Sequence, residues 1–132
     1  METKTYRDLV VWQKAMDLVE MVYKLSEKLP DKEKFGLISQ IQRAAVSVPA
    51  NIAEGYGRLH RGDYLRHLSF ARGSLAELET HVAIVVRLAY VTRDDVKPVW
   101  GMAQEVGKML RSMIEAMQRE ELKKSPTLDA RR

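Results

Sequence analysis

Apolar residues recur at alternating steps of three and four through four long stretches of the chain, and this rhythm constrains the fold more than any other feature. The spacing places the apolar side chains of each stretch along one seam of an α-helix. Short segments rich in proline, glycine and charge separate the stretches, which predicts helices over about 7–29, 34–58, 63–90 and 92–121. Four long helices with short turns predict an all-α fold, an antiparallel up-down-up-down four-helix bundle.

The first and fourth predicted helices carry wider apolar faces than one bundle core requires. One row of the first helix consists of Val11, Ala15, Leu18, Val22, Leu25 and Leu29. A second row consists of Leu9, Trp12, Met16, Val19 and Tyr23. The fourth helix is widened by a row of Met102, Val106, Met109, Met113 and Ala116. We expect the surplus on one of these two helices to form an oligomer interface.

The second predicted helix combines an internal proline with many small residues. Pro49 lacks an amide donor and displaces the carbonyl four residues before it, so we expect a kink near this position. The small residues of this helix are Ala44, Ala45, Ser47, Ala50, Ala53, Gly55 and Gly57. The third helix carries a patch of Ala71, Gly73, Ser74 and Ala76. Because small residues let two backbones approach, the two patches predict a close pair of helices.

Length and composition favour one globular domain over residues 1–132, with a helical core at about 6–121. We expect the polar segments 1–5 and 122–132 to be frayed and disordered, respectively. The absence of cysteine excludes disulfides and thiolate chemistry. No run approaches 18 apolar residues, so we expect no membrane span and a cytoplasmic protein. The net charge of +4 permits an acidic partner without requiring one.

The predicted helices carry no motif that indicates catalysis or metal binding. Di-metal sites in bundles use Glu-x-x-His pairs, and this chain has none. Glu77 and His81 are four residues apart, and we interpret them as a solvated or interface pair. The helical serines lack a matching His and Asp set. We therefore expect no catalytic residues, no metal, no cofactor and no enzymatic activity.

A basic cluster with interleaved aromatic residues lies around the connection between the second and third helices. Its candidate nucleic-acid contacts are Arg58, His60, Arg61, Tyr64, Arg66 and Arg72. Arginine forks match phosphate geometry, and aromatic faces stack on unpaired bases. Asp63 is the one acid within the cluster, and it lies three residues before Arg66, so these two side chains could simply pair. An ordinary solvated surface or a subunit contact is the alternative interpretation.

Four segments, in order and with consistent spacing, resemble the bacterial 23S rRNA intervening-sequence proteins. They are Leu9–Ala15, Phe35–Leu37, Arg43–Arg58 and Ala71–Thr80. The similarity extends from about residue 6 to residue 120. It is carried by the run RAAVSVPANIAEGYGR and by the run ARGSLAELET.

This resemblance implies a four-helix bundle that assembles into a ring-like homopentamer. It implies association with rRNA or another nucleic acid through the family's name. A more distant relative, the accessory variability protein of diversity-generating retroelements, binds nucleic acid and a reverse transcriptase. Asn51, Glu54, Arg72 and Glu77 match the family's pattern, and we interpret them as a structural polar network near the kink. The family supplies no set of catalytic residues.

Two functional hypotheses follow. The first is a non-enzymatic, oligomeric RNA-associated adaptor that contacts nucleic acid through the basic cluster. The alternative is a protein-interaction scaffold, a homo-oligomer with no nucleic-acid role. Self-association is expected under both hypotheses, so it does not separate them.

Overall fold

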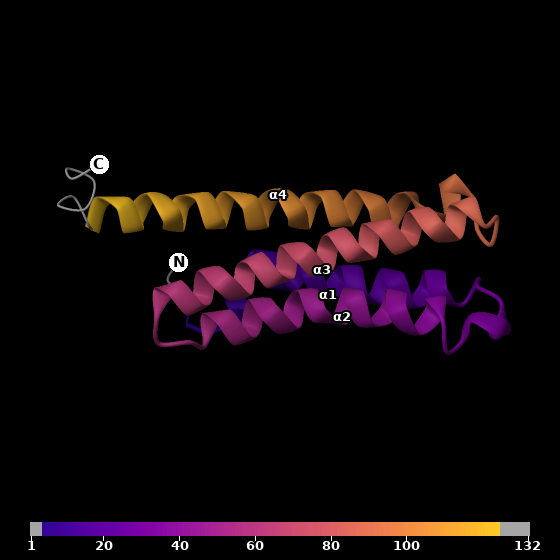
Figure 1. The fold of residues 1–132 in the computed structure, drawn as a ribbon, viewed down its shortest axis with the longest axis horizontal. Helices are drawn as coiled ribbons and strands as arrows, with labels where there is room; N and C mark the ends of the chain where they lie inside the picture. Colours follow the sequence, from indigo (N-terminus) through magenta and orange to yellow (C-terminus); the bar gives the residue numbers. More distant parts are fainter. Residues whose placement is uncertain (1–3, 125–132) are drawn as a thin grey trace.

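The computed structural model describes residues 4–124, and within this range the chain is helical without any β-strand (Figure 1). Four α-helices carry the fold: α1 (Val10–Ser26), α2 (Leu37–Tyr56), α3 (Arg61–Arg87) and α4 (Arg93–Lys124). Two 3₁₀ helices, η1 (Tyr6–Asp8) and η2 (Asp31–Glu33), precede α1 and α2. The predicted all-α class is confirmed.

The four helices form an antiparallel bundle in which each helix lies beside its neighbour in the sequence. α4 closes the ring by packing against α1, whereas the backbones of the diagonal pairs, α1 with α3 and α2 with α4, do not approach closely. The pair α2 and α3 makes the most extensive contact. α4 is the longest helix and extends past the other three at the end where both marked termini lie (Figure 1).

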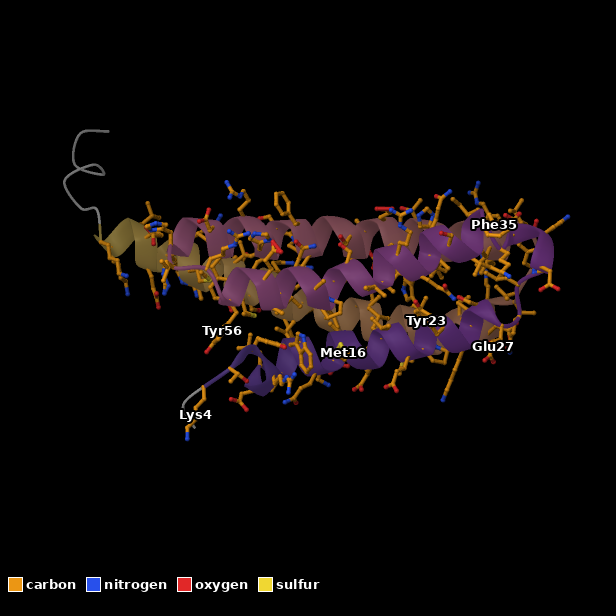
Figure 2. All side chains as sticks on the ribbon, turned by 90° about the horizontal axis from the view of Figure 1, so that it is seen from below. Lys4, Met16, Tyr23, Glu27, Phe35 and Tyr56 are labelled. Atoms are coloured by element: carbon orange, nitrogen blue, oxygen red, sulfur yellow. The ribbon has the colours of Figure 1, made fainter. Side chains whose placement is uncertain are left out.

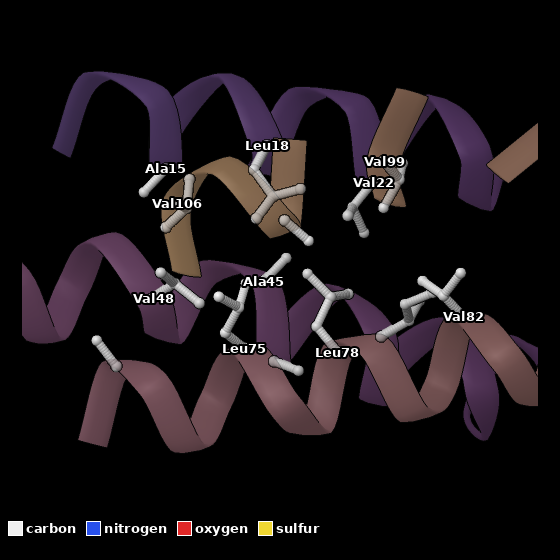
Figure 3. Close-up of a cluster of buried hydrophobic side chains, with 14 of the residues drawn as sticks. Ala15, Leu18, Val22, Ala45, Val48, Leu75, Leu78, Val82, Val99 and Val106 are labelled. Carbon is white, nitrogen blue, oxygen red and sulfur yellow. The ribbon is translucent and has the colours of Figure 1, made fainter. Parts of the chain in front are cut away.

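The core is built from one apolar seam of each helix (Figure 3). The α1 row that begins at Val11 and ends at Leu29 is entirely buried. Leu18 of α1, Val106 of α4 and Leu78 of α3 have no measurable exposure and converge on the bundle axis. On α1 the three-four rhythm therefore identified the core row correctly, because that rhythm keeps a seam facing the same neighbours along a whole helix.

The predicted contact between small residues is confirmed only in part. Ala44, Ala45 and Gly55 of α2 are buried, as is Ala71 of α3. Four other members of the two predicted patches lie at the surface: Ala50, Gly57, Gly73 and Ala76. Adjacent helical positions are 100° apart, so a patch that is continuous in sequence cannot lie wholly on one contact face.

Several helix boundaries differ from the predicted ones. α1 ends at Ser26, because the amides of residues 27–29 bond three residues back and tighten the chain before Pro30. Thr5 caps η1 in a capping box with Asp8, so residues 4 and 5 are held in place rather than frayed. α4 continues to Lys124, so residues 122–124 of the predicted tail are helical. Residues 1–3 and 125–132 lie outside the described part of the chain.

Pro49 lies inside α2, which continues unbroken to Tyr56. Its ring is buried, so the position that lacks an amide donor is packed against protein. The kink near Pro49 stays a prediction.

The start of α4 is capped, and the cap is also bonded to the segment that follows α1. The Thr92 amide donates to Asp95 at 2.9 Å, and the Asp95 amide donates to the Thr92 hydroxyl at 3.1 Å. Lys28, which follows α1, donates to the same Asp95 carboxylate at 2.8 Å. The hydrogen bond from Lys28, followed by those from Thr92, lowers the pKa of Asp95 from 3.8 to about 2. A carboxylate that is more acidic in the folded state stabilises that state when it is ionised.

Replacing Asp95 with Asn should therefore lower stability at neutral pH and flatten the acid dependence. The contribution of Asp95 is fully present above pH 3.8 and is lost as the pH falls toward 2. Urea denaturation between pH 7 and pH 2 measures this dependence. Asp94→Asn is the matched control, because the Asp94 side chain is exposed and, among residues 4–124, pairs only with Lys97, at 3.0 Å. Equal acid profiles for the two variants would contradict the assignment.

Candidate functional site

Three of the four arginines in the predicted basic cluster are paired with carboxylates. Arg58 donates to Glu54 at 3.3 Å, one turn earlier on α2. Arg66 donates to Asp63 at 2.8 Å, which is the pairing that the sequence left open. These contacts offset much of the local positive charge that the sequence suggested.

Arg61 makes the longest-range contact of the cluster. Its guanidinium lies 2.5 Å from Glu120 and 3.7 Å from Glu121, both at the far end of α4. These acids are about sixty positions away in the sequence, so no local count of charges includes them. Arg61 therefore fastens the start of α3 to α4.

The other members of the cluster have different environments. His60 is exposed at the N-terminus of α3 and makes no side-chain capping hydrogen bond. Tyr64 is partly buried, with its ring edge-on to Tyr56 at 6.0 Å between centroids. Burial raises the pKa of Tyr64. Arg72 is exposed and contacts no carboxylate within residues 4–124.

A polar clasp joins α2 to α3, and we define it as Ser47, Asn51, Glu54, His67 and Ser74. His67 is buried at its centre. The His67 Nδ1 atom lies 3.2 Å from Asn51 Oδ1, and Nε2 lies 3.2 Å from Glu54 Oε2. The clasp therefore places an acceptor at each nitrogen of the His67 ring.

The rest of the clasp fixes the orientation of Asn51. Its amide nitrogen donates to the Ser47 carbonyl at 2.9 Å and to the Ser47 hydroxyl at 3.0 Å. The Asn51 oxygen must then face His67, so His67 Nδ1 carries the proton of that hydrogen bond. The Ser47 hydroxyl is 2.8 Å from the Ser74 hydroxyl, which carries the chain of hydrogen bonds across to α3.

The contacts of the clasp hold α2 against α3, and they do not have the arrangement of an activated nucleophile. An activated serine needs a base within hydrogen-bond reach of its hydroxyl. Here the neighbours of Ser47 are the Asn51 amide and the Ser74 hydroxyl, and an amide is not a base at neutral pH. A satisfied network of this kind in a low dielectric specifies one helix register.

The structure brings together half of the predicted polar network. Asn51 and Glu54 belong to the clasp, whereas Arg72 and Glu77 lie outside it. The sequence interpretation missed the central residue, His67. Seven-residue spacing along α3 offered the signal, because His67 and Ser74 both contact α2 at that interval.

The pair of Glu77 and His81 is asymmetric. Glu77 is exposed and lies 3.5 Å from His81 Nε2, whereas His81 is buried. Both ring nitrogens of His81 are shielded from solvent and have no hydrogen-bond partner within the described residues. Of the two predicted interpretations, a solvated pair does not fit the buried His81. An interface pair stays a prediction.

Neither a metal cluster nor a membrane segment is found in the part of the chain that the structure describes. No three His, Asp or Glu side chains there are arranged to hold a metal ion. None of the described helices combines the length and the apolar character needed to cross a bilayer.

The fold and the clasp define a four-helix-bundle protein whose second and third helices are joined by polar contacts around the buried His67. The chain belongs to the 23S rRNA-intervening sequence protein family, whose model matches residues 7–112. A crystal structure from Bacteroides thetaiotaomicron, of a protein with unknown function from the S23 ribosomal protein family, is similar to this chain. The two share 28% identity and a TM-score of 0.74, over 80% of this chain and 98% of that one. No curated protein matches the sequence.

The clasp depends on the close approach of α3 to Gly55, which generates a prediction. A Cβ atom at Gly55 would lie 2.7 Å from the His67 Cβ and 3.1 Å from the Tyr64 ring. Gly55→Ala should therefore reduce the free energy of unfolding by about 1–3 kcal/mol, the usual cost of overpacking. Urea denaturation of the purified protein measures the change.

Gly73→Ala provides the matched control, because a Cβ at Gly73 meets nothing within 4 Å. This variant should gain about 0.5–1 kcal/mol, since alanine loses less backbone entropy in a helix. Equal stabilities for the two variants would show that α2 and α3 do not approach closely at Gly55.

Proposed function

We propose that this protein is a non-enzymatic, cytoplasmic homo-oligomer that acts as an RNA-associated adaptor. An exposed apolar stripe on one side of the bundle is the observation that supports self-association. The expected assembly is the homopentamer that the sequence resemblance implies. The family's description, which refers to 23S rRNA, supports the RNA part.

The α1–α2 stripe is formed by partly or fully exposed apolar side chains of the two helices and their connection. Its members are Trp12, Met16, Val19, Tyr23, Phe35, Ile38 and Val46. Tyr23 is 47% exposed and Phe35 is 91% exposed, and these two line one pocket together with Val46 (Figure 2). Contiguous apolar surface of this kind is typical of a protein interface.

The stripe contains the surplus row that the sequence predicted on the first helix. The companion row on α1 fills the bundle core. In the surplus row, Trp12 and Val19 are partly buried against that core, whereas Met16 and Tyr23 are 41% and 47% exposed. The surplus residues of α4 are more covered, since Met102, Met109 and Met113 pack against the core. Of the two predicted surplus faces, α1 is therefore the better supported interface.

The carboxylate pairing of the arginine cluster favours the alternative function, a scaffold with no nucleic-acid role. Arg58, Arg61 and Arg66 already have anionic partners, and an RNA phosphate would compete with them. The scaffold hypothesis needs only the α1–α2 stripe. RNA binding is therefore the property that separates the two hypotheses.

The interface is tested by placing a charge in the stripe. Tyr23→Glu should convert the wild-type oligomer to monomer, because an unpaired carboxylate in an apolar interface is costly to bury. Leu88→Glu is the matched control, since Leu88 is 51% exposed at the end of α3 and outside the stripe. Light scattering after size exclusion should give about five times the 15.2 kDa chain mass for wild type and for the control. A wild-type monomer would refute the proposed assembly.

The RNA role is tested by measuring binding of a structured rRNA fragment and an unrelated RNA across a salt series. Phosphate contacts release counterions, so we expect the affinity to fall steeply as salt increases. A preference for the rRNA fragment would support the adaptor. Absence of binding at low salt, where charge interactions are least screened, would favour the scaffold.

A further inference from the structure

We propose that RNA contacts this protein on the outer face of α3 and α4, where Arg72 and Arg111 receive its phosphates. The inference rests on the proposed RNA-associated function and moves its contact surface away from the α2–α3 connection. Arg72 was one of the predicted contacts, whereas Arg111 lies outside the basic cluster that the sequence indicated. We name this surface the α3–α4 arginine face, and its central pair is Arg72 and Arg111.

The pairing of α3 with α4 places these two arginines beside each other. The Gln104 amide donates to Glu79 across the two antiparallel helices. Arg72 lies seven residues before Glu79, and Arg111 lies seven residues after Gln104. Seven residues are close to two helical turns. Arg72 therefore lies on the same side of α3 as Glu79, and Arg111 lies on the same side of α4 as Gln104. Moving from the Gln104–Glu79 contact by two turns along both helices therefore leads to Arg72 opposite Arg111.

A second contact confirms this register and shows how close the helices are. A Cβ atom built on Gly107 would lie 3.2 Å from the Leu75 side chain. Leu75 lies between Arg72 and Glu79, and Gly107 lies between Gln104 and Arg111. The hydrogen bond between Gln104 and Glu79 therefore places Arg72 opposite Arg111, and the approach of Gly107 to Leu75 supports this placement.

The arginine pair differs electrostatically from the α2–α3 connection. Neither Arg72 nor Arg111 has an ion pair or hydrogen bond through its guanidinium among residues 4–124, and both are exposed. The exposed outer side of the neighbouring α4 turns adds Lys108, Glu115 and Arg119. Four cationic side chains therefore share this face with two carboxylates, Glu115 and Glu79, and Glu79 already accepts a hydrogen bond from Gln104. Like charges at this proximity repel, and a bound anion would relieve that repulsion.

The same face carries an exposed aromatic ring. Trp100 is 44% exposed, and the three-four spacing of positions 100, 104, 107 and 111 places it on the α4 side that contains Arg111. The separation of Trp100 from Arg111 along α4 is about 16 Å, from a rise of 1.5 Å per residue. A strand that bridges this distance could set phosphates on the arginines and stack an unpaired base on the indole.

The combination of two adjacent arginines with an exposed tryptophan ring favours a nucleic-acid strand over an acidic peptide as the ligand. A guanidinium fork matches a phosphate in a bidentate geometry, and two adjacent forks suit successive phosphates. Base stacking on an aromatic ring tolerates any sequence, which suits a single-stranded segment of RNA. An acidic peptide would use the arginines but would leave the Trp100 ring without a specific role.

The test compares RNA binding by the full chain with binding by the double variant Arg72→Gln with Arg111→Gln. The probe is a single-stranded RNA, and the affinity is measured at several salt concentrations. Loss of two phosphate contacts should lower the slope of log affinity against log salt by about 1.4 for a single strand. The affinity at low salt should fall about tenfold or more. Both residues are exposed, so the thermal unfolding midpoint should stay within a few degrees of wild type.

The matched control is Arg58→Gln with Arg66→Gln, which removes the same charge from two arginines that already pair with acids. This control should bind with nearly the wild-type slope. If it loses as much affinity as the first double variant, binding follows net charge and the α3–α4 arginine face is refuted. If wild type binds RNA and the Arg72 and Arg111 variant binds equally well, this inference fails while the proposed function stands. If wild type binds no RNA at low salt, both fail.

Trp100→Leu tests the stacking part separately. It keeps an apolar side chain on α4 but removes the aromatic face, so the affinity should fall about tenfold at every salt concentration. The salt slope should not change, because no phosphate contact is lost. Unchanged affinity for this variant would remove Trp100 from the contact surface.

Discussion

The approach of α3 to α2 at Gly55 is the constraint on which the rest of the bundle depends. The absence of a side chain at Gly55 brings the His67 Cβ within 2.7 Å of where a Cβ would lie. At that separation His67 reaches Asn51 and Glu54, and Ser74 reaches Ser47. Buried polar groups are costly unless they are paired, so this set of contacts selects one register of α2 against α3. The other helices then pack on a pair whose relative position is already fixed.

The fold was largely readable from the sequence because its signal is repetitive. The row from Val11 to Leu29 repeats one spacing over five turns, and every member is buried as predicted. The cap formed by Thr92 and Asp95 is likewise a local feature, because capping uses residues only three apart. Patterns that depend on neighbours within one helix can be recognised from a single sequence.

The site was less readable because its contacts join residues from different helices. The sequence pattern linked Asn51 with Arg72 and Glu77, yet the structure joins it to His67, 16 positions away. The charge of the α2–α3 connection was overestimated for a similar reason, since Glu120 reaches Arg61 from the far end of α4. A local window counts the charges that neighbour each other in sequence, whereas the electrostatic field depends on those that neighbour each other in space.

The fit between Gly55 and His67 also has a consequence for how this sequence can change. Position 55 has no room for a methyl group while position 67 carries a side chain as close as that of His67. Only glycine at position 67 would remove the Cβ atom that a methyl group at position 55 meets, and it would leave Asn51 and Glu54 without their shared partner. The two positions are therefore energetically coupled, and a substitution at one is tolerated or rejected according to the residue at the other. Substitutions at positions 55 and 67 should therefore be accepted together rather than one at a time.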